Sequence, residues 1–208
     1  HSSYKNRFNN DNFLNEYFRG KPILSVSEDD KRNMWLLTSK GELYIYNLEN
    51  KKIENLNVSQ LLYKSIPQNN IKEVLVSTLF IDNEGNLWLG SKENGKVWQC
   101  ILTEDKLRLV SDYDVFGPNV FTQDNNGTIW LSTTSEYVYS LKKGDSDFEP
   151  LQIYTPFFNF VSGFITLRNG KIMASPFYHR PKMIDPDRRT VEEIIFDEAH
   201  NLEEVATK

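Results

Sequence analysis

The sequence predicts an all-β protein, a partial β-propeller of about four blades that are each a four-stranded antiparallel sheet. Two observations lead to this fold class. A segment of about 43 residues recurs along the chain, and each copy alternates apolar stretches with turn residues. A lone meander of that length cannot bury both of its faces, whereas radially packed sheets cover one another. The chain of 208 residues is long enough for such an arc.

The four copies follow one template: an apolar strand, an acidic or Asn/Gly turn, a strand centred on a large anchor residue, a polar loop and a further strand. The copies occupy residues 25–47, 77–100, 119–141 and 164–185. Their anchor residues lie 53, 42 and 43 positions apart and are Trp35, Trp88, Trp130 and Met173. Because these residues recur at equivalent positions, we interpret them as structural packing residues.

The strands of each copy follow from local composition. Residues 83–86 (NEGN) and 125–128 (NNGT) supply the Gly and Asn that tight hairpin turns with positive φ require. Two apolar strands are expected to be buried on both faces: 87–90 (LWLG) and 129–132 (IWLS). Two alternating strands are expected to be half-buried: 42–47 (ELYIYN) and 137–141 (YVYSL). Fourth strands are expected at 52–56, 106–110 and 190–194.

These patterns also predict the boundaries of the blades. The predicted blades are 25–75, 76–118, 119–163 and 164–195. Residues 1–24 are expected to be a linker or the end of a preceding blade, with a strand within 8–22. Residues 196–208 are expected to be a linker or the start of a further blade, and 192–208 alternatively a short amphipathic helix. An arc of four blades exposes two blade faces, which predicts self-association or dependence on further blades.

Composition excludes several classes of protein. With 24 basic and 29 acidic residues, the net charge is −5, so the chain has no overall basic footprint and nucleic acid is not an expected partner. No apolar window approaches the roughly 18 residues of a membrane helix, so no membrane contact is expected within these residues. Cys100 is the only cysteine, which excludes an internal disulfide and a multi-cysteine zinc site. Its apolar surroundings indicate a buried small residue.

The sequence contains few residues in patterns typical of catalysis. Asp112 and Asp114 are two residues apart, which places both carboxylates on one face of a strand. There is no cluster of metal ligands and no G-x-S-x-G nucleophile motif. We therefore expect no catalytic residues, no metal and no cofactor.

The second copy carries the most specific motif. Residues 80–95 read F-x-D-x-x-G-N-L-W-L-G-S-x-x-x-G and resemble the two-component regulator propeller repeat. The matching residues are Phe80, Asp82, Gly85, Leu87, Trp88, Leu89, Gly90 and Ser91. The third copy matches through Asp124, Gly127, Ile129, Trp130, Leu131, Ser132 and Thr133, with Ser132 in place of the usual Gly. The resemblance covers about residues 25–195 and is weaker in the first and fourth copies.

The resemblance implies a non-enzymatic function. Such repeats build the periplasmic sensor region of hybrid two-component histidine kinases of Bacteroidetes. By that resemblance, the segment binds an oligosaccharide or another small ligand, the remaining blades of the parent chain complete the propeller, and the full sensor is a homodimer of an inner-membrane protein. The kinase and the membrane helix would lie elsewhere in that chain.

Four residues are candidates for ligand binding. Trp98 occurs outside the repeated anchor positions, and sugar rings stack well on indole, although a core position is the alternative. Tyr178, His179 and Arg180 interrupt the repeat template in a loop bracketed by Pro176 and Pro181. Such a cluster can stack on a sugar and bind its hydroxyls or a carboxylate. An ordinary exposed loop or a contact between blades is the alternative.

Residues 194–206 (IIFDEAHNLEEVA) resemble the Walker B segment of DEAH-type helicases. Nucleotide hydrolysis also needs a phosphate-binding loop, and the sequence has no G-x-x-x-x-G-K-[ST] motif. An acidic linker or helix is the simpler interpretation. For the chain as a whole, two other functions stay open beside the sensor: a propeller enzyme acting on a polysaccharide or small molecule, and a protein-interaction scaffold.

Overall fold

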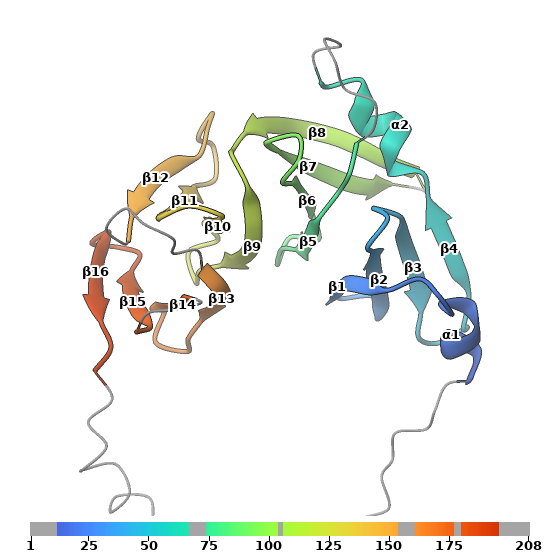
Figure 1. Cartoon of the computed structure of the whole chain (residues 1–208), viewed down its shortest axis with the longest axis horizontal. Coiled ribbons are helices and arrows are strands. Elements are labelled where there is room, and N and C mark those ends of the chain that lie inside the picture. Colours follow the sequence, from blue (N-terminus) through green and yellow to red (C-terminus); the bar gives the residue numbers. More distant parts are fainter. Residues whose placement is uncertain (1–11, 67–73, 104–105, 154–160, 177–179, 196–208) are drawn as a thin grey trace, which may run out of the picture.

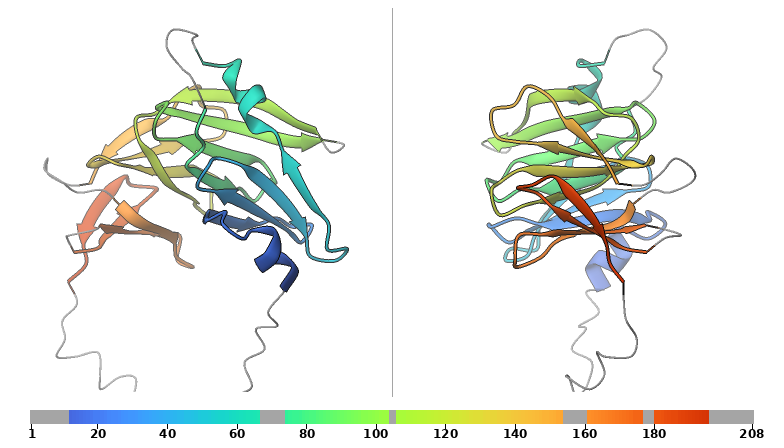
Figure 2. Two further views of the ribbon diagram at one scale, coloured as in Figure 1. Left: turned by 45° about the vertical axis from the view of Figure 1, so that its right-hand side comes forward. Right: turned by 90° about the vertical axis from the view of Figure 1, so that its left-hand side faces the viewer.

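The computed structural model describes residues 12–66, 74–103, 106–153, 161–176 and 180–195 and shows four antiparallel four-stranded sheets. Each sheet consists of four consecutive strands paired in chain order, which confirms the predicted partial propeller. The sheets follow one another along an arc (Figure 1), and Figure 2 shows them stacked face to face. No helix among the described residues is long and apolar enough to cross a membrane.

The four blades begin and end as follows. Blade one consists of β1 (Ile23–Glu28), β2 (Asn33–Thr38), β3 (Leu43–Asn47) and β4 (Ile53–Leu56), and blade two of β5 (Thr78–Ile81), β6 (Leu87–Ser91), β7 (Lys96–Thr103) and β8 (Lys106–Asp114). Blade three consists of β9 (Pro118–Gln123), β10 (Ile129–Thr133), β11 (Tyr137–Leu141) and β12 (Glu149–Gln152), and blade four of β13 (Val161–Thr166), β14 (Ile172–Pro176), β15 (Lys182–Asp185) and β16 (Thr190–Glu193). The fourth strands predicted for copies one, two and four are present, and blade three has a fourth strand, β12, that was not predicted.

The first two strands of every blade are joined by the same tight turn. A residue with positive φ closes it: Gly85, Gly127 and Gly170 in blades two to four, with φ of 80°, 84° and 82°. In blade one Arg32 takes this conformation with φ of 61°. The turn in blade two is closed by backbone hydrogen bonds from Gly85 N to Asp82 O and from Asp82 N to Asn86 O. The predicted turns at 83–86 and 125–128 are therefore confirmed.

The core is divided among the interfaces between blades. Trp35 packs with Leu79, Leu87 and Leu89 of blade two. Trp88 packs in the same way with residues of blade three, and Trp130 with residues of blade four. Each anchor tryptophan therefore faces the blade that follows it. As predicted, the strands β6 and β10 are buried throughout, because their blades are covered on both faces.

A short helix covers the outer face of blade one. The prediction of a strand within residues 8–22 is wrong for the described part of that range, which contains the helix α1 (Asn12–Tyr17). Leu14 and Phe18 pack on Tyr44 and Tyr46 of β3, and the rings of Phe18 and Tyr44 meet edge to face at 5.1 Å. Consequently β3, expected to be half-buried, is buried over its first four residues.

The expectation of two exposed blade faces is also wrong for blade one, whose face α1 occupies in the manner of a terminal cap. A second helix that the sequence analysis missed, α2 (Val58–Tyr63), follows β4 and buries Val58 and Leu62 in the core between blades one and two. Each of these helices has six residues, which is too short for a helical period to stand out in the sequence.

Blade four shows what an uncovered face looks like. Along β14, Ile172 and Ala174 are fully buried against blade three, whereas Met173 between them is only half-buried. The neighbouring Ile165 of β13 is 52% exposed. The described residues thus cover blade four on one face only. Residues 196–208, with the predicted linker or helix and the DEAH string, lie outside the described part of the chain.

We predict that the packing of α1 stabilises blade one. Phe18→Ala should lower the free energy of unfolding by about 1 to 3 kcal/mol, because it uncovers Tyr44 and Tyr46. Phe13→Ala, within α1 itself, should cost less than about 0.5 kcal/mol because Phe13 is 48% exposed. Urea unfolding of both variants is the measurement, and equal losses would contradict a specific role for Phe18.

Candidate functional site

Three of the four anchor positions are held by one repeated hydrogen bond. In blades one to three, an aspartate of the turn accepts the indole N–H of the tryptophan six residues later, at 2.9 Å in each case. The pairs are Asp29 with Trp35, Asp82 with Trp88, and Asp124 with Trp130. The tryptophans are between 1% and 3% exposed and cannot present a face to a ligand.

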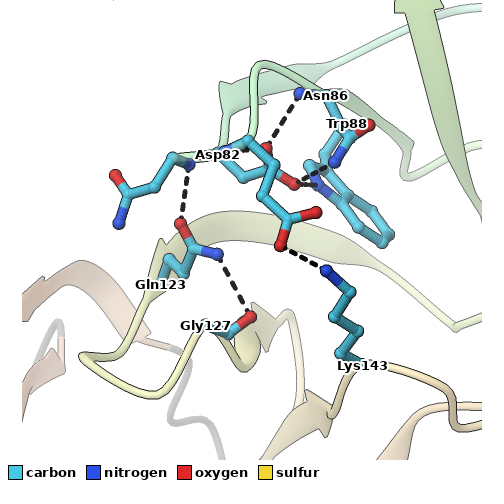
Figure 3. Close-up of polar contacts among 8 residues, drawn as sticks. Asp82, Asn86, Trp88, Gln123, Gly127 and Lys143 are labelled. Atoms are coloured by element: carbon cyan, nitrogen blue, oxygen red, sulfur yellow. Dashed lines mark hydrogen bonds and ion pairs between the residues drawn. The ribbon is translucent and has the colours of Figure 1, made fainter.

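Blade two shows the full set of bonds (Figure 3). One carboxylate oxygen of Asp82 accepts the backbone N–H groups of Glu84 and Asn86, at 2.9 and 2.8 Å. The other accepts Asn86 Nδ2 at 2.8 Å and Trp88 Nε1 at 2.9 Å. The carboxylate is buried and its acceptor sites are used by four donors, so Asp82 organises the turn and offers no free base.

Blade four lacks both partners of this bond. Leu167 stands where the turn aspartate belongs, and Met173 replaces the tryptophan. The backbone turn is nevertheless the same, with hydrogen bonds from Leu167 N to Lys171 O and from Gly170 N to Leu167 O. Losing both polar partners together leaves no buried donor or acceptor unpaired, which is the less costly way to lose the pair.

The turns of blades two and three are also tied to each other (Figure 3). Gln123 accepts the backbone N–H of Asn83 at 2.8 Å and donates to Gly127 O at 3.1 Å, while Lys143 Nζ lies 2.8 Å from a carboxylate oxygen of Glu84. The crevice beside these contacts has a volume of about 140 Å³. Ligand pockets are typically about 300 to 1,000 Å³, so this crevice is a joint between blades.

The structure separates the four predicted binding residues. Trp98 is fully buried, and its Nε1 donates to Ser65 Oγ at 2.7 Å; the interpretation as a stacking platform is therefore wrong for this fold, because the segment around α2 covers the ring. Tyr178 and His179 lie outside the described residues. The side chain of Arg180 is 65% exposed, and its Nη1 is 3.4 Å from a carboxylate oxygen of Glu193.

The other residues considered for catalysis, Asp112, Asp114 and Cys100, have structural roles. Asp112 and Asp114 do share a face of their strand, where both carboxylates bind Lys96 Nζ at 2.8 Å. Cys100 is fully buried, and burial raises the pKa of its thiol to about 12, so it is not a poised nucleophile. Among the residues that the structure describes, no three His, Cys, Asp or Glu side chains come together as a metal site.

A cavity with a ligand-sized volume lies along the first strands of blades one to three. These strands, β1, β5 and β9, lie on the concave side of the arc (Figure 1). The axial groove between them has a volume of about 500 Å³. It is lined by Leu24, Ser25, Val26, Ser27, Ser77, Thr78, Leu79, Phe80, Lys92, Asn119, Val120 and Phe121. We take this axial groove as the candidate site.

The groove combines apolar and polar surfaces. Leu24 and Val26 are 55% and 53% exposed, which is high for apolar side chains in a strand. Ser77 Oγ donates to Gly90 O at 3.2 Å and accepts the backbone N–H of Lys92 at 3.1 Å. Partial burial lowers the pKa of the Lys92 side chain below its usual value. An apolar wall beside hydroxyls and one ammonium group suits a small polar ligand with a C–H face.

The axial groove was not predicted from the sequence. Its residues come from three copies of the repeat and share no motif. One sequence feature is consistent with the groove. In the first copy, residues 23–28 (ILSVSE) include alternating apolar and polar side chains, as expected for a strand beside the propeller axis that is not buried on both faces. In a propeller the first strand of each copy lies at the axis, so the first strands are where an axial groove is expected.

Comparisons with known proteins support the fold and give no family. No protein-family model matches the chain, and no curated protein matches it. Among solved structures, virginiamycin B lyase from Staphylococcus aureus matches with a TM-score of 0.62 and 14% identity over 86% of this chain. The extracellular domain of the putative hybrid two-component system BT4673 from B. thetaiotaomicron matches with a TM-score of 0.57 and 14% identity, also over 86%.

PorZ, a surface component of the type-IX secretion system of Porphyromonas gingivalis, matches with a TM-score of 0.60 and 10% identity over 85% of this chain. This chain spans 57% of the lyase, 23% of the BT4673 domain and 27% of PorZ. At these identities the likeness shows a shared propeller fold. The expected resemblance to two-component sensors is thus found at the level of the fold.

We predict that Asp82 and Trp88 are energetically coupled. Asp82→Leu should lower the free energy of unfolding by about 2 to 4 kcal/mol, because it leaves buried N–H donors unpaired. Adding Trp88→Met, which reproduces the pair of blade four, should cost about 1 kcal/mol less than the sum of the single changes. Urea unfolding of the two single variants and the double variant measures this coupling.

The exposed Asp145 serves as the matched control, since Asp145→Leu should change the stability by less than about 0.5 kcal/mol. Strictly additive losses for Asp82→Leu and Trp88→Met would show that the hydrogen bond between the two side chains contributes nothing.

The hydrogen bonds that Asp29 accepts predict that the stability of the protein depends on pH. Burial acts to raise the pKa of Asp29, but hydrogen bonds from Trp35, Asn33 and Lys31 outweigh it and hold the pKa below 3.8. A pKa depressed by folding stabilises the protein above the unfolded value, and that contribution disappears as the pH falls through the folded value. The stability advantage over Asp29→Asn should therefore be constant above about pH 5 and shrink below pH 3.8. Urea unfolding at several pH values tests this, and a constant difference down to pH 2.5 would contradict it.

Proposed function

We propose that this chain is a ligand-sensing, oligosaccharide-binding segment of the periplasmic part of a hybrid two-component sensor. The axial groove carries the proposal. It is of ligand size, it draws residues from three blades, and its lining includes both exposed apolar side chains and hydroxyl groups. Sugar rings present the matching surfaces, with apolar C–H faces and hydroxyl edges.

Two further observations support a sensor. Residues 80–95 resemble the two-component regulator propeller repeat, and the fold resembles the extracellular domain of BT4673. Because this chain spans 23% of that domain, further blades of the parent chain would be its nearest partners. A homodimer of the full sensor would then transmit ligand binding to the kinase. Such a parent would place these blades in the periplasm.

We further propose that the ligand is bound without being converted. The residues that line the axial groove include neither a carboxylate nor an imidazole, so among them there is no general base of the usual kind. The competing proposal is an enzyme, and the fold likeness to virginiamycin B lyase is the observation that favours it. A protein-interaction scaffold is the third candidate.

One experiment separates these functions. Incubation with a panel of plant and host oligosaccharides, followed by thermal melting and mass spectrometry, should give a ligand that raises Tm and is recovered with unchanged mass. A changed mass would favour an enzyme. A Tm unmoved by every oligosaccharide would contradict the sensor proposal and favour a scaffold.

The place of binding is tested by filling the axial groove. Val26→Trp should weaken binding of the oligosaccharide at least tenfold, because the indole would occupy the groove, while stability should change by less than about 1 kcal/mol at this exposed position. Val110→Trp is the matched control, since Val110 is 49% exposed on β8 and does not line the groove. Titration calorimetry measures both. Equal affinities of the two variants would place the binding site elsewhere.

A further inference from the structure

Blades two and three each have a face that receives the preceding blade, and it is built in the same way in both. The two residues that flank the anchor tryptophan on the second strand, with their cross-strand partners on the third strand, form this receiving face. In blade two it packs in one cluster with Trp35 of blade one, and in blade three with Trp88 of blade two. The residues are Leu87, Leu89, Trp98 and Cys100 in blade two, and Ile129, Leu131, Tyr139 and Leu141 in blade three.

Blade one has the same receiving face, although no blade precedes it among the described residues. Met34 and Leu36 flank Trp35 on β2, and they pair in register with Tyr46 and Tyr44 on β3. All four belong to one apolar cluster on the side of blade one that faces away from blade two. Blade one therefore carries a surface of the kind that receives a blade elsewhere in the chain.

Residues 12–21, which we call the cap segment, cover this receiving face. Leu14 and Phe18 pack on Tyr44 and Tyr46, and Lys21 Nζ donates to Tyr44 Oη at 2.8 Å. Figure 1 shows α1 beside blade one at the end of the arc. A preceding blade would place a whole sheet at this position, whereas the cap segment places two apolar side chains and one ammonium group there.

The other end of the arc carries the face that enters a receiving face. In blades one to three the anchor tryptophan lies on that side and packs with the following blade. In blade four the row at this position consists of Ile165, Met173 and Met183, which are paired in register. Ile165 is 52% exposed, and both methionines are partly exposed. The described residues thus leave an apolar row open at the end of the arc opposite to the cap segment.

We propose that blade four of one copy of this chain docks on the receiving face of blade one of a second copy, and that the cap segment blocks this contact. The contact would continue the series of interfaces that already joins blades one to four. It joins two different faces, so it leads to a closed ring or to a growing chain of copies.

The short connection between the cap segment and β1 explains why the cap has the advantage. Residue 21 lies two positions before β1, so the cap segment is always close to the receiving face. A short tether corresponds to an effective concentration on the order of millimolar. A second copy at lower concentration cannot compete with it, and the intact chain should be monomeric. This inference does not depend on the proposed ligand.

The test weakens the cap in the full chain. The uncapped variant, Leu14→Ser with Phe18→Ser, should show an average mass in sedimentation equilibrium of at least about twice that of the monomer, and this mass should rise with concentration. Phe13→Ser is the matched control, because Phe13 lies in α1 but is 48% exposed. It should stay monomeric, as should the intact chain.

A second change tests whether blade four is the partner. Adding Ile165→Asp to the uncapped variant should abolish association, because it would bury an unpaired charge in the contact. Adding Val110→Asp should not, since Val110 is 49% exposed on β8, away from both ends of the arc. The uncapped Ile165→Asp protein offers only a receiving face, and the intact chain offers only the row on blade four. Mixed together, these two monomers should form a one-to-one complex.

Three results would overturn the inference. The first is an uncapped variant that stays monomeric, and the second is association that survives Ile165→Asp, which would indicate unspecific contacts of the uncovered tyrosines. The third is association of the intact chain with its cap in place. Urea unfolding establishes that each variant is folded. If the double change removes the cooperative transition, Phe18→Ala takes its place in the same experiments, with the same results expected and the same results excluded.

Discussion

The fold depends on one constraint, which is that each blade is a sheet with two apolar faces and both must be covered. In blades two and three the neighbours on either side do this, and their second strands are buried throughout. In blade one the preceding neighbour is replaced by α1 and the residue that follows it, because Leu14 and Phe18 pack on Tyr44 and Tyr46. Blade four has a described neighbour on one side only, and its second strand alternates between buried and half-buried residues.

The repeated aspartate and tryptophan pair links this packing to the turns. The tryptophan provides a large apolar surface to the next blade, and its N–H must find an acceptor once it is buried. The turn aspartate provides that acceptor and at the same time fixes the backbone of the turn. The pair therefore couples local turn geometry to the interface between blades. Blade four, with Leu167 and Met173, shows that the turn itself survives without it.

The same radial arrangement creates the axial groove. Because the first strand of each blade lies at the concave side of the arc, β1 contacts β5 and β5 contacts β9 although these strands are far apart in the sequence. These strands are less deeply buried than the second strands, so apolar and hydroxyl side chains remain open beside Lys92. A rigid wall built from strands holds such groups at fixed positions, which suits a binding site.

The sequence by itself determined the repeat, the order of the strands and the tight turns, because these depend on local composition and on periodic positions such as Trp88 and Gly85. It did not determine which elements cover the end of the arc: α1 and α2 are too short to show a helical period, and their helical state depends on docking against Tyr44 and the core between blades one and two. The binding surface was also decided by tertiary structure alone. Trp98 is isolated in the sequence but buried in space, whereas Leu24, Ser77 and Lys92 are unremarkable in the sequence and come together because radial packing places the first strands around one axis.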